Sequence, residues 1–153
     1  MVDVDALVRD LRERIGFEGA PFTHTVETGA LIKFAKAVGE TNPIYLDEAY
    51  AKTTRFGGLI ACPTWVSVYP PEVMSGVAVR DLPLARFLHT DDVADIKGVI
   101  RPGDRITAVG RYADVYTRNG RNGVLLFQAV DISLTNQRQE LVATVRVVLV
   151  NFE

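Results

Sequence analysis

The chain has 153 residues, 48% of them hydrophobic and 24% charged, with a formal net charge of -2. This length predicts one domain with a full hydrophobic core. The slight acidic excess argues against the clustered basic surface that nucleic-acid or anionic-membrane binding requires, so neither partner is expected. The sequence shows no leader pattern and no apolar run long enough to span a bilayer.

The single cysteine, Cys62, excludes an internal disulfide and a cysteine-based zinc site. A reducing cytoplasm is therefore the expected compartment. The two histidines, His24 and His89, do not have the spacing of metal ligands, and we expect no metal. His24 is expected at the surface or an interface, and His89 is expected to be structural.

The first half of the chain predicts helices. Residues 4–15 repeat apolar residues at helical spacing, with Asp3 or Asp5 as the cap and Gly16 at the end, so residues 1–20 form an N-terminal helix and lead-in. An extended segment over 22–27 precedes two short helices over 30–38 and 47–54. The apolar stretch 59–74 predicts a buried helix that begins near Pro63 and stops before Pro70.

The second half predicts strands. Four segments rich in β-branched and aromatic residues are separated by turn signals, which predicts the long strands of an antiparallel meander over 85–99, 104–117, 123–135 and 141–152. Several strands are apolar on both faces, as in a sheet that wraps a helix and meets a second subunit. The chain is therefore expected to be a single α+β domain over 1–153, with a long sheet around a central helix in the hot-dog arrangement.

Two segments carry a family resemblance. Residues 39–47 read GETNPIYLD, and residues 56–65 read FGGLIACPTW. Together with RPGD at 101–104, they resemble the MaoC-like hydratases and dehydratases, and within these the subfamily named after the dehydratase domain of fungal fatty acid synthase. The resemblance runs from about residue 22 to the C-terminus. It implies a hot-dog fold and chemistry on acyl thioesters.

The resemblance also locates catalytic positions. Catalytic members read Gly-Asp-x-Asn-Pro-(apolar)-His, which places Glu40 at the aspartate, Asn42 at the asparagine and Tyr45 at the histidine. Hydration of an enoyl thioester needs a base for water and an acid for the substrate carbon, and a backbone N–H holds the developing enolate. That donor falls near Pro63, which has no N–H. Base, acid and oxyanion donor all depart from the working pattern.

Each candidate residue has a functional and a structural interpretation. Glu40 is either a base or a solvated loop carboxylate, and Tyr45 either an acid or a space-filling side chain. Asn42 shapes the loop and is a candidate ligand contact, as are the neighbouring motif positions Cys62, Pro63 and Trp65. Arg118 and Arg121 flank a glycine-rich hairpin and either meet the phosphates of coenzyme A or phosphopantetheine, or solubilise a loop.

Three functions follow from these alternatives. The first is a subunit of a heteromeric 3-hydroxyacyl-thioester dehydratase, or enoyl-CoA hydratase, in which a partner hot-dog chain supplies the aspartate and histidine. The second is a self-sufficient homo-oligomeric hydratase or thioesterase that uses Glu40. The third is a non-catalytic acyl-thioester-binding module. We expect no cofactor, and coenzyme A or phosphopantetheine only as part of a fatty or steroid-like substrate.

Overall fold

The computed structural model describes residues 2–121 and 123–153. The helices, including two 3-10 helices labelled η, are α1 (Val4–Arg12), α2 (Thr28–Ala37), η1 (Pro43–Tyr45), α3 (Glu48–Lys52), η2 (Pro63–Val68) and α4 (Pro70–Val77). The strands are β1 (Phe22–Thr25), β2 (Arg86–Ile96), β3 (Arg105–Gly120), β4 (Gly123–Thr135) and β5 (Leu141–Phe152). The predicted α+β class is confirmed.

The strands form one antiparallel sheet in the order β1-β3-β4-β5-β2. The consecutive pairing of β3, β4 and β5 was predicted. The prediction that β2 precedes them in the same meander is wrong, because β2 pairs with β5 at the far edge. Residues 97–104 cross between the edges: the N–H of Gly98 donates to Val142 O at 3.0 Å, and the N–H of Gly103 donates to Val26 O at 2.8 Å. Local turn chemistry does not encode this crossing.

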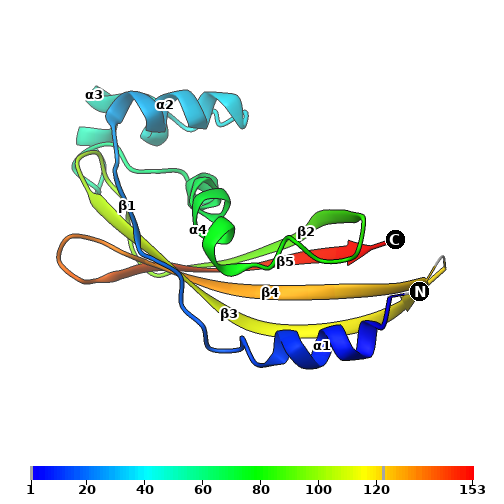
Figure 1. Ribbon diagram of the computed structural model, residues 1–153. Coiled ribbons are helices and arrows are strands. Elements are labelled where there is room, and N and C mark those ends of the chain that lie inside the picture. The colour runs from blue at the N-terminus through cyan, green and yellow to red at the C-terminus, as the bar shows by residue number, and fades with distance from the viewer. Residues whose placement is uncertain (1, 122) are drawn as a thin grey trace.

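The central helix, α4, lies on the concave face of the sheet (Figure 1), which confirms the hot-dog arrangement. The segment predicted to begin near Pro63 and stop before Pro70 is η2, a 3-10 helix over Pro63–Val68, but the second helix that follows it was not predicted. After η2 the chain continues into α4, whose first turn contains Pro70 and Pro71. The first N–H groups of a helix have no partner within it, so proline is tolerated there. The prolines therefore restart the helix, and Val73 and Val77 become part of the buried core.

The N-terminal helix follows the prediction closely. The Asp3 carboxylate accepts from the N–H of Ala6 at 3.0 Å, which makes Asp3 the N-cap of α1. Gly16 has a φ of +95°, a conformation that favours glycine, and its N–H donates to Tyr112 O on β3 at 2.8 Å. These contacts tie the lead-in to the sheet.

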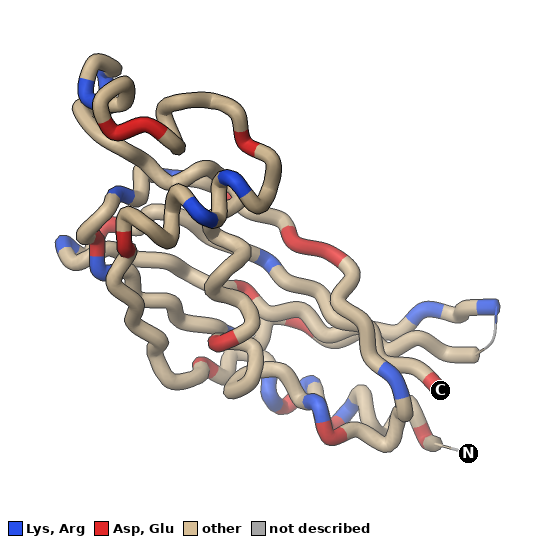
Figure 2. Tube along the Cα trace, turned by 90° about the horizontal axis from the view of Figure 1, so that it is seen from above, with Lys and Arg blue, Asp and Glu red and all other residues tan. Residues whose placement is uncertain are grey.

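Basic and acidic residues are mixed along the fold. Figure 2 shows Lys and Arg interspersed with Asp and Glu along the chain. Within the described residues, no helix is long and apolar enough to cross a membrane.

Candidate functional site

The loop between α2 and α3 holds the residues of the GETNPIYLD segment. Gly39 ends α2 with a φ of +79°, and the N–H of Glu40 donates to Ala35 O at 2.9 Å. The Asn42 side-chain oxygen accepts from the N–H of Ile44 at 3.1 Å and so caps η1. Asp47 caps α3 in the same way, through the N–H of Tyr50 at 3.0 Å. Glycine, asparagine and aspartate thus fix the loop backbone.

The loop brings Glu40 and Tyr45 close to Cys62. Burial raises the pKa of Tyr45 above its ordinary value of 10.0, and the nearby carboxyl of Glu40 and thiol of Cys62 raise it further. The Tyr45 phenol therefore stays protonated well above neutral pH. In the part of the chain that the structure describes, no group donates a hydrogen bond to the Glu40 carboxylate.

The start of η2 borders these residues. Its N-cap is Cys62 and its first residue is Pro63, so the first backbone N–H of this helix belongs to Thr64. The Cys62 thiol is buried and lies 3.4 Å from the Thr64 hydroxyl oxygen. Trp65 is also buried, with its ring edge-on to Phe34 at 5.2 Å and its indole N–H donating to the Tyr69 hydroxyl at 3.4 Å. The Trp65 side chain is therefore used in core packing.

A buried carboxylate fixes this region to the sheet. Asp104 accepts from the N–H of Arg101 at 2.8 Å and from the Gln137 amide at 3.0 Å. The Arg101 guanidinium donates to Phe56 O at 2.7 Å, and the N–H of Ala61 donates to Ile100 O at 2.9 Å. The RPGD turn thus positions the segment that leads into η2.

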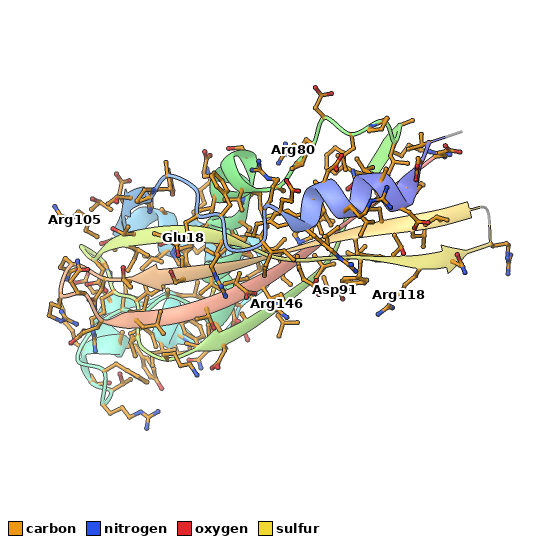
Figure 3. The ribbon with its side chains drawn as sticks, turned by 60° about the horizontal axis from the view of Figure 1, so that its bottom comes forward. Glu18, Arg80, Asp91, Arg105, Arg118 and Arg146 are labelled. Atoms are coloured by element: carbon orange, nitrogen blue, oxygen red, sulfur yellow. The ribbon has the colours of Figure 1, made fainter. Side chains whose placement is uncertain are left out.

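The two hairpin arginines lie elsewhere. Arg118 is on β3, near the end of the sheet opposite α2 and α3 (Figures 1 and 3). Its guanidinium lies 5.5 Å from the ring centroids of Tyr116 and Phe127, which stack on each other. Arg121 lines a groove of about 850 Å³ together with residues of the N-terminus. The structure does not bring Arg118 or Arg121 together with Glu40 and Tyr45.

The histidines occupy different environments. His24 is half-buried and lies edge-on to Tyr69, with ring centroids 6.3 Å apart, so its ring faces the core and not an open surface; its placement at an interface stays a prediction. His89 bonds Asp92 at 2.7 Å on β2. Among the described residues, no group of three His, Cys, Asp or Glu side chains could hold a metal ion.

One buried polar network was not predicted. The side-chain oxygen of Gln128 on β4 accepts from the N–H of Val79 at 3.0 Å and from the Tyr112 hydroxyl at 3.1 Å. Its side-chain nitrogen donates to Val79 O at 2.9 Å and to the Asn151 side-chain oxygen at 2.8 Å. It thereby holds the segment after α4 against the sheet. The sequence signal that could have indicated this network was a single amide residue, Gln128, inside a largely apolar strand.

The family is shown by comparison with known proteins. The family model for the FAS1-like, dehydratase domain region matches residues 13–145. The chain belongs to this family. This assignment confirms the resemblance to hot-dog hydratases and dehydratases.

Curated relatives extend the comparison. A UPF0336 protein of Streptomyces avermitilis is 31% identical over 110 residues, which cover 68% of this chain and 73% of the relative. The 3-oxo-4,17-pregnadiene-20-carboxyl-CoA hydratase alpha subunit of Mycobacterium tuberculosis is 28% identical over 94 residues. That match covers 54% of this chain but 30% of the alpha subunit.

Solved structures share the fold. The HadBC complex, a 3R-hydroxyacyl-ACP dehydratase of Mycobacterium tuberculosis, has a TM-score of 0.77 at 21% identity, covering 90% of this chain and 97% of that chain. The ChsH1-ChsH2 complex of the same organism has a TM-score of 0.74 at 21% identity, covering 98% of this chain and 91% of that chain.

Proposed function

We propose that this chain is the non-catalytic subunit of a heteromeric 3-hydroxyacyl-thioester dehydratase, or enoyl-CoA hydratase. A partner hot-dog chain supplies the aspartate and histidine. The observation that carries the proposal is a loop between α2 and α3 whose backbone is held by caps, while it presents Glu40 and Tyr45 where the family resemblance implies an aspartate base and a histidine acid. At the start of η2, Pro63 stands where the resemblance implies the oxyanion N–H.

The chemistry of each position supports this reading. A carboxylate on a side chain one methylene longer than aspartate is displaced by more than the roughly 0.5 Å that a good site tolerates. The Tyr45 phenol, with a pKa raised above 10.0, is poorly matched to proton transfer near neutral pH. Pro63 has no N–H with which to hold an enolate oxygen.

The names of several relatives support a heteromeric assembly. Two of the similar structures are complexes of two chains, HadBC and ChsH1-ChsH2, and one curated relative is an alpha subunit. For this chain we propose an acyl thioester as substrate, with coenzyme A or phosphopantetheine as its carrier and no separate cofactor.

Co-expression tests the proposal. The isolated chain should leave crotonyl-CoA unhydrated, and co-expression with a hot-dog chain that contains an intact Gly-Asp-x-Asn-Pro-x-His motif should give hydration, followed as loss of enoyl absorbance. Replacing the partner's motif aspartate by asparagine should abolish the activity of the complex. Glu40→Gln in this chain should leave it unchanged, as should the control Glu48→Gln, which removes an exposed carboxylate from α3.

A self-sufficient enzyme is the second candidate, because Glu40, Tyr45 and Cys62 do lie together. If Glu40 is a general base, the isolated chain is active, and Glu40→Gln lowers kcat by about 100-fold or more while Glu48→Gln does not. That result would overturn the subunit proposal. Binding of crotonyl-CoA in calorimetry without turnover, alone or with the partner, would instead indicate an acyl-binding module.

A further inference from the structure

The convex face of the sheet carries a regular grid of side chains. Gln128 on β4 bonds Val79 beside α4 and therefore points to the concave face. Its neighbours Phe127 and Ala129 point to the convex face, because successive residues of a strand alternate. Directly paired residues of neighbouring strands share a face, so the strand register extends the convex face across β3, β4, β5 and β2.

Three rows of side chains on this face cross all four strands, and together they are called the convex grid here. From β3 to β2, the first row is Asp114, Ala129, Val148 and Asp91. The second row is Tyr116, Phe127, Val150 and Leu88. The third row, nearest the tip of the β3–β4 hairpin, is Arg118, Leu125, Phe152 and Arg86.

Two β-bulges place the carboxylates of the first row. Tyr112 and Asp114 lie opposite consecutive residues of β4, so Ala113 is the extra residue of β3. Thr90 is the extra residue of β2 in the same way, directly before Asp91. On a regular strand, Asp114 would share the concave face with Tyr112. The bulges therefore bring both aspartates to the convex face, at the same level of the sheet.

The centre of the convex grid is apolar and partly exposed. The side chains of Tyr116, Phe127, Val148 and Phe152 are half-buried, and Leu88 is 57% exposed. Strands lie about 4.8 Å apart and rows about 6.8 Å apart, so the grid spans about 14 Å in each direction. An apolar patch of this size marks a site of weak association rather than the interface of a permanent dimer.

Charges occupy the four corners of the convex grid. Arg118 and Arg86 lie at the hairpin end, and Asp114 and Asp91 lie at the other end. Within the described residues, none of these four side chains forms an ion pair in its own chain. Each guanidinium lies over an aromatic ring of the grid, at 5.5 Å for Arg118 and 5.1 Å for Arg86. Asp91 on β2 and Arg118 on β3 are labelled in Figure 3.

The convex grid is complementary to itself. If a second copy is turned about a twofold axis along the middle row, each strand faces the same strand of that copy, running antiparallel. Arg118 then faces Asp114 of the second copy, and Arg86 faces its Asp91, while the apolar middle row faces itself. An axis along the strands would instead set Arg118 against Arg86 and Asp114 against Asp91. Charge therefore selects the first orientation and disfavours the second.

We propose that the convex grid binds a second copy of this chain, sheet on sheet, about an axis along the row that contains Tyr116 and Phe127. Two aligned sheets pack about 10 Å apart with their strands within about 30° of each other. The competing interpretation is that the corner charges only solubilise the face, which predicts no preferred register. The proposal concerns the isolated chain, so it stands or fails separately from the proposed catalytic partner.

Disulfide cross-linking tests the register. Val148 faces Phe152 of the second copy, and a disulfide can span two sheets packed at this distance. The double variant Val148→Cys/Phe152→Cys should therefore form a covalent dimer on oxidation. Either single variant should not, because its cysteine faces a residue without a thiol and the native Cys62 is buried. Contact between sheet edges would leave the new cysteines apart, because β5 is an inner strand.

A second variant repeats the test on the axis itself. Phe127 faces Phe127 of the second copy, so Phe127→Cys should cross-link as a single variant. Ser133→Cys lies on the same strand and the same face but outside the convex grid, and it should not cross-link. The proposal is wrong if neither the double variant nor Phe127→Cys gives a covalent dimer, or if the control variants cross-link equally fast.

Charge reversal in the double-cysteine protein tests the complementarity. Asp114→Arg sets a cation against Arg118 in both symmetry-related pairs and should lower the initial rate of cross-linking by about tenfold. The swapped variant Arg118→Asp/Asp114→Arg should restore the rate. Asp95→Arg, which makes the same charge change on the same face outside the convex grid, is the matched control. If Asp114→Arg cross-links as fast as Asp95→Arg, the pairing of Arg118 with Asp114 is wrong.

Discussion

Replacing Gly110 by alanine tests how closely α4 lies on the sheet. A Cβ at Gly110 would lie 2.4 Å from Val73 Cγ1, 3.1 Å from Val77 Cγ2 and 3.4 Å from Val130 Cγ1. Carbon atoms in favourable contact are about 3.5–4.0 Å apart, so α4 or Val73 must move. Overpacking a core costs about 1–3 kcal/mol, and loss of glycine flexibility in the unfolded chain offsets about 0.4–1 kcal/mol. We expect a net loss of about 1–2 kcal/mol in the free energy of unfolding.

Urea denaturation at one fixed protein concentration measures this loss, since association changes apparent stability. The control is Gly76→Ala on α4, where an added Cβ meets no atom within 4 Å. Alanine should there stabilise the helix by up to about 1 kcal/mol. Because Val73→Ala removes the atom nearest to the new Cβ, the double variant Gly110→Ala/Val73→Ala should cost less than the sum of the single changes. A Gly110→Ala protein as stable as the wild type would refute close packing of α4 on β3.

Two further changes test buried and exposed polar groups. Gln128→Leu leaves the Val79 backbone and the Asn151 side chain without their partner, and urea denaturation should show a loss of about 3 kcal/mol or more in the free energy of unfolding. A loss below about 1 kcal/mol would contradict the network. Hydrogen bonds from Arg146 hold the pKa of Asp131 in the folded protein below its ordinary 3.8. The ionised carboxylate therefore stabilises the fold above pH 3.8, and this contribution is lost as the pH falls through the lower pKa of the folded state. Asp131→Asn should therefore lower stability at neutral pH and match the wild type in strong acid; a difference that persists there would exclude this ion pair as the cause.

The elements set by local pattern were predictable. β4 has the predicted bounds, Gly123–Thr135, because turn residues mark both of its ends. The pairing of β2 with β5 was not predictable, because it depends on residues 97–104 crossing to the other edge. The bulge at Thr90 also leaves no clear local signal, so the contact between His89 and Asp92 was not foreseen.

The candidate site also contains features that the sequence indicated and features that it did not. Glu40, Tyr45 and Cys62, which the family motif singled out as candidates, lie in one region of the structure. The position of Arg118 beside a glycine-rich hairpin suggested either phosphate contacts or a solubilising loop; in the structure its guanidinium lies over the rings of Tyr116 and Phe127. Whether any of these residues meets a substrate stays a prediction.

The residues that carry the family motif in this chain serve the backbone. Gly39 provides the positive φ that ends α2, and the side chains of Asn42 and Asp47 cap the next two helices. The loop needs these contacts whether or not a reaction takes place beside it. Among the described residues, the side chains at the positions that would perform the reaction form no such hydrogen bond: Glu40 joins the loop through its N–H, and Tyr45 through an N–H that donates to Asn42 O at 3.1 Å. The shape of the loop therefore depends on Gly39, Asn42 and Asp47 and not on the side chains of Glu40 and Tyr45.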